Sequence, residues 1–182
     1  MSEEHKKVQV TTMIAPKESP IYIMASRFHV DPEKMVGILK ATVIKGPDGR
    51  EATTEEVAAF MIVANEYGLN PFTREIHAFV SREKGVVPIV GVDGWAHLIN
   101  NQPDFDGCDF EETVGDNGKP IKTTCTIYHK KRQHPVRITE WFEECYRNTI
   151  PWNNMPKRML RHKSLMQCAR YAFSLSGLYD ED

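Results

Sequence analysis

The longest helix of this chain is predicted from residues 156–177, whose sequence is PKRMLRHKSLMQCARYAFSLSG. Pro156 suits the first turn of a helix, because the amide proton that proline lacks would have no helical partner there. Gly177 suits the position just past a helix end, where a left-handed backbone is common. We therefore expect one long helix near the end of the chain.

A helical repeat of about 100° per residue sorts this segment into faces. Lys163 and Arg170 fall on one stripe with Gln167. Lys157 and Arg161 lie one turn apart on another side. Apolar stripes separate these edges, and they consist of Met159, Met166 and Phe173 and of Leu165, Ala169 and Ala172. The helix is thus expected to bury apolar side chains between two basic edges.

Basic charge is concentrated near this helix, although the chain as a whole has a net charge of -2. Residues 145–179 contain no Asp or Glu, and their six cations are Arg147, Lys157, Arg158, Arg161, Lys163 and Arg170. A local basic patch favours an anionic partner, and cations on a rigid helix can follow a phosphate backbone. A solvated helix face is the simpler interpretation, but the usual i, i+4 carboxylates are missing, and a second basic cluster lies at residues 129–137.

The composition, with 41% hydrophobic and 26% charged residues, is that of an ordinary globular protein. A length of 182 residues suits one domain, which we place at residues 19–182, after a polar and flexible segment 1–18. No apolar run could cross a bilayer and no signal peptide is evident, so we expect no membrane partner and a cytoplasmic location. The cysteines lack C-x-x-C spacing, which favours free, buried thiols over a zinc site.

Three helices are predicted in the first third of the chain. Ser19 before Pro20 and Asp31 before Pro32 are typical helix starts. Thr53, followed three residues later by Glu56, is a capping box that precedes apolar residues at helical spacing.

Strands are predicted at residues 76–80, 86–90 and 105–114, and then in two further segments. Ile121, Cys125 and Ile127 would form the inward face of one, and Val136 and Ile138 that of the other. A short helix capped by Asp93 would separate the strands at 86–90 and 105–114. Segregated helices and strands predict an α+β fold, with a small antiparallel sheet of about three strands, a long C-terminal helix and additional N-terminal helices.

Carboxylates crowd residues 104–116, and paired carboxylates can hold Mg²⁺ for phosphodiester cleavage. A metal-dependent nuclease that uses Asp104 with Glu111 or Glu112 is therefore one alternative. The acid-x-Lys pattern of such sites is missing, because Lys119 follows Asn117 and Gly118 instead, which favours an acidic, solvated strand edge. We also find no Walker A loop and no nucleophile elbow.

Aromatic residues are interspersed among the basic segments, and flat side chains beside a basic groove bind single-stranded nucleic acid. Packing in the core is the simpler interpretation, and we expect it for Trp95 and Trp141.

Several motifs closely resemble the Bet family of phage recombination proteins, within the wider RecT group. They are NPFTREI at residues 70–76, VGVDGW at 90–95, FDG at 105–107, PKRMLRHK at 156–163 and QCAR at 167–170. The resemblance runs from about residue 20 to the end of the chain, with the motifs in the family's order.

This resemblance implies a recombination mediator that anneals single-stranded DNA and is not an enzyme. Proteins of the family coat single-stranded DNA left by an exonuclease and pair it with a complementary strand without ATP. They work as homo-oligomeric rings and helical filaments on single-stranded DNA and on the annealed duplex. No cofactor is implied, although Mg²⁺ is expected to modulate annealing.

The resemblance also implies which residues bind DNA and which proteins are partners. The implied contacts with the DNA backbone are made by Lys157, Arg161, Lys163, Arg170, Arg74 and Arg82. Family members usually continue into a C-terminal module that recruits a phage 5′–3′ exonuclease and the host single-strand binding protein, and this module is expected to be missing here. The place of action would be the cytoplasm of a bacterial host. A metal-dependent nuclease and a non-annealing nucleic-acid adaptor are the alternatives, and no helix-turn-helix supports the adaptor.

Overall fold

The computed structural model describes residues 19–46, 50–81 and 85–179. Residues 1–18, predicted to be flexible, and Arg82 lie outside the described residues. In chain order the elements are α1 (Pro20–Phe28), α2 (Pro32–Thr42), β1 (Ile44–Lys45), α3 (Thr54–Glu66), β2 (Ile76–Ser81), β3 (Gly85–Val90), α4 (Val92–Asn100), β4 (Phe105–Val114), β5 (Pro120–His129), β6 (Val136–Trp141), α5 (Phe142–Cys145), α6 (Ile150–Asn154) and α7 (Pro156–Phe173). The α+β class is confirmed.

The three predicted helix starts are confirmed, because Ser19, Asp31 and Thr53 cap the first three helices through their side chains. The side chain of Ser19 accepts a hydrogen bond from the Tyr22 amide at 3.3 Å, and that of Asp31 accepts one from the Glu33 amide at 3.0 Å. Thr53 and Glu56 form the reciprocal capping box, with distances of 3.2 and 2.9 Å. These bonds satisfy amide groups that a helix leaves without partners in its first turn.

Two three-stranded sheets are present in the described residues. The antiparallel order β4-β5-β6 confirms the sheet predicted from residues 105–138. The hairpin of β2 and β3 forms a second sheet, to which β1 adds a parallel strand by pairing Ile44 with Ala78. The sequence did not predict β1, because a strand of two residues is too short to show an alternating pattern.

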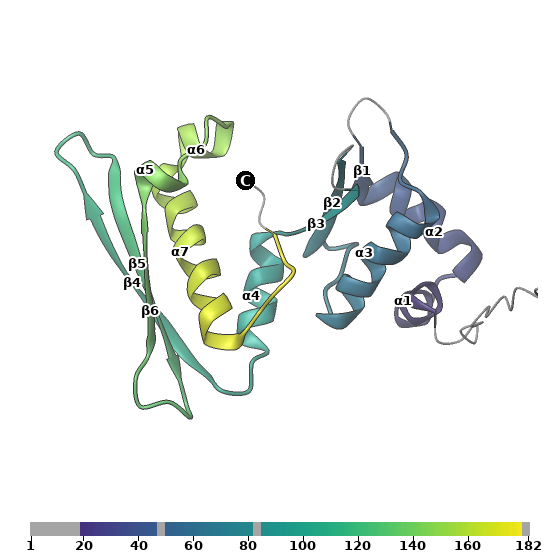
Figure 1. The fold of residues 1–182 in the computed structure, drawn as a ribbon, viewed down its shortest axis with the longest axis horizontal. Helices are drawn as coiled ribbons and strands as arrows, with labels where there is room; N and C mark the ends of the chain where they lie inside the picture. Colours follow the sequence, from purple (N-terminus) through teal and green to yellow (C-terminus); the bar gives the residue numbers. More distant parts are fainter. Residues whose placement is uncertain (1–18, 47–49, 82–84, 180–182) are drawn as a thin grey trace, which may run out of the picture.

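The helices divide the molecule into layers (Figure 1). α7 covers one face of the β4-β5-β6 sheet, α4 lies beside α7, and α1 to α3 pack around the β1-β2-β3 sheet. One apolar cluster continues through these layers, from Phe60 on α3 through Trp95 on α4 to Cys168 on α7. None of the described helices combines the length and the apolar character that crossing a membrane requires.

The NPFTREI loop and the first turn of α4 meet at Gly94. A Cβ atom at Gly94 would lie 2.1 Å from the carbonyl oxygen of Glu75, so only glycine fits there. The Gly91 amide donates to the same oxygen at 3.1 Å, and Gly91 is the residue that caps α4. The prediction that Asp93 caps this helix is therefore wrong, because Asp93 already lies within its first turn.

The end of the long helix also differs from the prediction. α7 ends before Ser174, which adopts the left-handed conformation with a φ of 56°, and not at Gly177. The chain turns early because residues 174–179 fold back onto the N-terminal half. There the Val90 amide donates to the Tyr179 carbonyl at 2.9 Å, and the Tyr67 hydroxyl donates to the Ser176 carbonyl at 2.5 Å.

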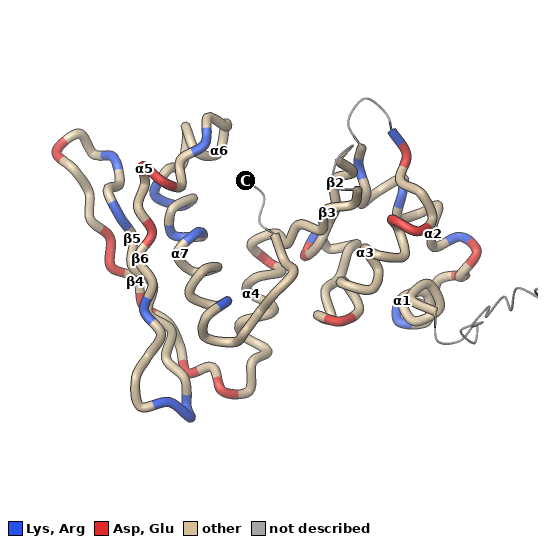
Figure 2. Tube along the Cα trace, in the orientation of Figure 1, with Lys and Arg blue, Asp and Glu red and all other residues tan. Residues whose placement is uncertain are grey.

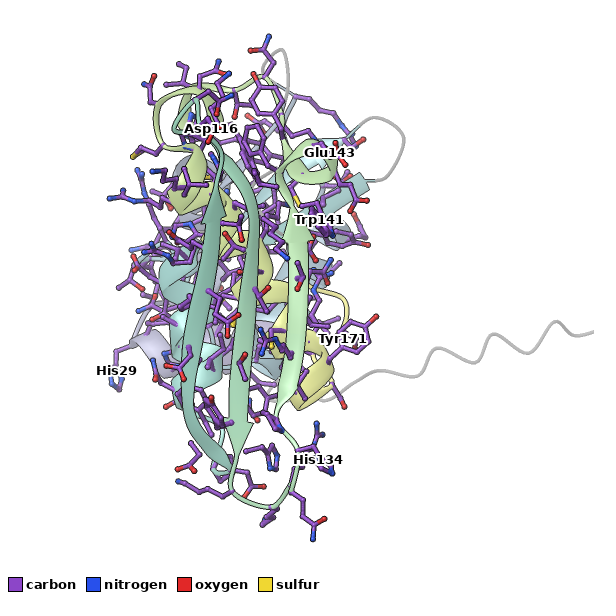
Figure 3. The ribbon with its side chains drawn as sticks, turned by 90° about the vertical axis from the view of Figure 1, so that its left-hand side faces the viewer. His29, Asp116, His134, Trp141, Glu143 and Tyr171 are labelled. Atoms are coloured by element: carbon purple, nitrogen blue, oxygen red, sulfur yellow. The ribbon has the colours of Figure 1, made fainter. Side chains whose placement is uncertain are left out.

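Two side chains that were predicted to be buried are exposed. Ile121 is 44% exposed, because it lies beside the Gly115 turn at the end of the β4-β5 hairpin. Trp141 is 41% exposed at the end of β6, where the Lys122 ammonium lies 5.2 Å from the ring centroid (Figure 3). The prediction of burial is confirmed for Trp95, at 1% exposure.

Candidate nucleic-acid interface

The first turn of α7 carries two free cations. Lys157 and Arg158 are exposed, and neither forms an ion pair with a described residue. The sequence excludes only a local partner, since residues 145–179 contain no carboxylate. Lys and Arg side chains of this kind can bind phosphate by releasing its counterions.

Arg161, one turn further along, is held by a carboxylate of the neighbouring strand. Its Nη2 lies 2.6 Å from Oε1 of Glu112, its Nε donates to the same oxygen at 2.8 Å, and the guanidinium lies 5.8 Å from the Phe110 ring centroid. Figure 2 shows the acidic residues of β4 beside the basic residues of α7. A phosphate at Arg161 would therefore compete with Glu112 for the Nε and Nη2 donors.

Lys163 is half-buried and faces the side of α7 near α5. Burial raises the pKa of the Cys145 thiol to about 12, and the hydrogen bond of this thiol to Glu140, at 3.2 Å, acts in the same direction. The ammonium of Lys163 opposes this rise in pKa, which places its charge close to Cys145. The ammonium of Lys163 thus interacts with a group of the protein as well as being available to solvent.

Arg170 binds the end of the described chain. Its guanidinium donates to the Leu178 carbonyl and lies 5.6 Å from the centroid of the Trp95 ring. The side chain thereby holds residues 174–179 against α4. A DNA contact by Arg170 remains a prediction. For such a contact the guanidinium would have to bind a phosphate beside the Leu178 carbonyl or give up its hydrogen bond to that carbonyl.

Arg74 lies at a different place, just before β2. It is exposed, has a φ of 64°, and is fixed in the loop whose Asn70 side chain accepts from the Phe72 amide at 2.9 Å. Arg74 shares a cavity of about 200 Å³ with Lys45 and His77. The structure therefore gathers four of the six predicted DNA-binding residues on α7, places Arg74 beside the other sheet, and does not describe Arg82.

A larger cavity, of about 320 Å³, opens between α4, α6 and α7, and the sequence interpretation missed it. Arg158 and His162 line it from α7, and Trp95 lines it from α4. The i, i+4 spacing of Arg158 and His162 was visible in the sequence, and it indicates that the two share a helix face. The opposite wall comes from segments far away in the chain, which no local pattern reveals.

The carboxylates named in the nuclease alternative lie apart and are paired with cations. Asp104 lies in the turn before β4, whereas Glu111 lies seven residues further along, in the second half of that strand. Asp104 pairs instead with Lys131 at 3.0 Å, and Glu111 pairs with Arg137 at 2.5 Å. In the described part of the chain, no three His, Cys, Asp or Glu side chains are grouped so that they could hold a metal ion.

Two comparisons relate the chain to known proteins. The RecT family model matches residues 34–182. The recombination protein bet of Escherichia phage lambda is 47% identical to the chain over 163 residues, which cover 84% of the chain and 59% of that protein. The chain thus spans about three fifths of the length of this relative.

Proposed function

The chain belongs to the RecT family, and from this membership we propose that it is an ATP-independent single-strand annealing protein of phage recombination. The proposal is that it binds single-stranded DNA and pairs it with a complementary strand. α7 is the observation that carries it, because this helix contains the PKRMLRHK motif and exposes Lys157 and Arg158, which pair with no described carboxylate.

The first strand binds along α7 through its phosphates. Lys157 and Arg161 are four residues apart, about 6 Å along the helix axis at 1.5 Å per residue. Lys157 binds a phosphate directly, whereas Arg161 does so when the phosphate replaces the carboxylate of Glu112. Contacts of this kind are independent of sequence and leave the base edges free to pair with a second strand.

Base pairing and charge neutralisation supply the free energy of annealing in this proposal. Pairing stacks bases and brings a second row of phosphates to the protein, so the complex with duplex is favoured without nucleotide hydrolysis. The cations of α7 in one subunit neutralise few phosphates, which is too little for tight binding at physiological salt. We therefore include a homo-oligomeric ring or helical filament in the proposal.

The remaining parts of the proposal follow from family membership. They are the recruitment of a phage 5′–3′ exonuclease and of the host single-strand binding protein, action in the bacterial cytoplasm, and modulation of annealing by Mg²⁺. A C-terminal module would perform the recruitment.

A strand-annealing measurement tests the function. Two complementary oligonucleotides that carry an energy-transfer pair are mixed with the protein in the absence of nucleotide, over a range of protein and salt concentrations. We expect annealing faster than the spontaneous rate, and a loss of this acceleration in a Lys157→Ala, Arg158→Ala double variant. The matched control is a double variant that also removes two exposed cations, Lys34→Ala on α2 and Lys119→Ala between β4 and β5. No acceleration by the wild type under any of these conditions contradicts the proposal.

The nuclease alternative is tested with the same DNA. Labelled single- and double-stranded DNA is incubated with the protein and Mg²⁺ or Mn²⁺. We expect the strands to keep their length. Shortened products that disappear in an Asp104→Ala variant would show that the protein is a nuclease instead.

A further inference from the structure

The cavity between α4, α6 and α7 is an apolar surface that is partly open to solvent. Its volume is about 320 Å³, and Val92, Met155 and Met159 are among the apolar side chains that line it. Val92 is 48% exposed and Met155 is 41% exposed. Ile150, which directly precedes the cavity residue Pro151, is 77% exposed. Large apolar side chains gathered around a hollow are typical of a site that binds another protein.

The charged groups that line this cavity are basic. Arg158 and His162 lie on successive turns of α7, and the lining residues outside α7 are uncharged. Arg158 is exposed and forms no ion pair with a described residue. Because charges across an interface are complementary, an apolar group with a carboxylate beside it would fit this cavity better than one with a cation.

α3 presents such a combination to solvent. Ala59, Ile62 and Glu66 follow one another at intervals of three and four residues and are all exposed, so they share one side of the helix. Ile62 is 56% exposed. Glu66 lies one turn further along, about 6 Å from Ile62 along the helix axis at 1.5 Å per residue, and it forms no ion pair with a described residue.

α3 and the cavity belong to different parts of the molecule. α3 packs with the β1-β2-β3 sheet, and in Figure 1 it lies on the side of α4 opposite to α7. The helix of one chain therefore does not cover the cavity of the same chain, but a second copy can bring its α3 there. A helix that inserts apolar side chains into a groove is a common mode of association. Since the two surfaces are different, the contact is head-to-tail, and its repetition generates a ring or a helical filament.

We propose that the cavity between α4, α6 and α7 receives α3 of a second copy, with Ile62 against Met155 and Met159 and with Glu66 on Arg158. The inference rests on the oligomer included in the proposed function and assigns the surfaces that form it. Arg158 then binds the neighbouring copy, whereas Lys157 remains available to DNA. Because one contact is repeated, the α7 helices of successive copies lie at a constant spacing.

Two variants that each disrupt one half of the contact test the proposal. Ile62→Asp places a charge on α3, and Val92→Asp places one at the cavity. Both residues are exposed, so both variants should fold, which circular dichroism verifies. Sedimentation velocity of the full chain, without DNA and on oligothymidylate, measures the number of subunits. We expect each variant alone to associate about tenfold more weakly than the wild type, or weaker still, because burial of one isoleucine is worth about that factor.

An equimolar mixture of these two variants distinguishes a head-to-tail contact from other contacts. Each variant retains the surface that the other has lost, so the mixture should form a species of two subunits and extend no further. Ile23→Asp, on α1, is the matched control, since Ile23 is 48% exposed and lies outside the proposed contact. This control should assemble as the wild type does.

An exchange of charges tests the ion pair. Glu66→Arg and Arg158→Glu should each weaken association. The double variant should recover the subunit number of the wild type, because every contact then contains the same pair in reverse. Failure of the double variant to recover would show that these two residues do not meet.

Four further outcomes would overturn the inference. A wild type that stays monomeric under all these conditions forms no such contact. Full assembly of Ile62→Asp or of Val92→Asp means that the altered surface is not used, and an equal loss in Ile23→Asp places the contact on α1 instead. A mixture that does not pair means that the two surfaces do not meet. Annealing by the wild type is measured in parallel: it persists where this inference alone fails, and it is absent where the proposed function fails.

Discussion

Arg161 on α7 and Glu112 on β4 are joined by an ion pair with an Nη2–Oε1 distance of 2.6 Å. The pair connects the basic edge of the long helix to the acidic strand beside it. Because Arg161 is 48% exposed and Glu112 is 27% exposed, water screens the attraction, and the pair contributes no more than about 1 kcal/mol to stability. An incoming phosphate can therefore displace the carboxylate.

Replacing Glu112 by Gln should strengthen binding to single-stranded DNA. The change frees Arg161 and removes a negative charge next to the phosphates, so we expect an increase in affinity of about three- to tenfold at low salt. Fluorescence anisotropy measures the affinity. Glu111→Gln is the matched control, since it removes the same charge from the adjacent position and frees Arg137 instead. An equal increase in both variants would mean that only net charge matters.

Lys157→Ala should weaken binding to all DNA sequences alike. The loss of one phosphate contact should lower the slope of log affinity against log salt by about one per bound subunit. Stability should hardly change, because the side chain is exposed and pairs with no described residue. Salt titrations of Lys157→Ala and of the control Lys34→Ala measure the difference. Identical slopes for these two variants would remove Lys157 from the interface.

Arg170→Ala should destabilise the fold, in contrast to Lys157→Ala. It leaves the carbonyl of the buried Leu178 without its donor, which we expect to cost about 1–3 kcal/mol. Urea unfolding measures the cost, and proteolysis within residues 174–179 reports the release of the segment. Arg170→Lys keeps the charge and should recover part of the stability. If Arg170→Ala lowers the salt slope of DNA binding and leaves stability unchanged, Arg170 acts on DNA alone.

The helices and the meander could be predicted because their signals are local. The cap of each of the first three helices lies within a few residues of sequence, and β4 begins and ends at the predicted residues. The burial of Met166, Ala169 and Ala172 on α7 follows from the helical repeat. Leu160, Ser164 and Cys168 are buried as well, because the sheet, α4, α5 and α6 all pack against α7 and together cover more than one stripe.

The site was only partly predictable, since the residues that contact its basic side chains come from distant parts of the chain. The repeat placed Lys157 and Arg161 on one side of a helix, but it could not show that Glu112 of β4 would pair with Arg161. It could not show either that Arg170 would bind the carbonyl of Leu178, because that contact requires the chain to reverse after Ser174. The cavity beside Trp95 could not be predicted for the same reason, because its walls come from segments that are distant in the sequence.

Gly94→Ala tests the contact that aligns Trp95 with the NPFTREI loop. The added Cβ would lie 2.1 Å from the Glu75 carbonyl oxygen and 2.7 Å from a methyl group of Val90, so the first turn of α4 must shift. We expect a loss of stability of about 1–3 kcal/mol, as for overpacking in a core. Gly37→Ala on α2 is the matched control, since nothing lies within 4 Å of its Cβ and alanine is the better helix former, which predicts a gain of about 0.5–1 kcal/mol. Urea unfolding measures both changes. Equal effects at the two positions would show that Glu75 yields to the extra methyl group and that this glycine is not required.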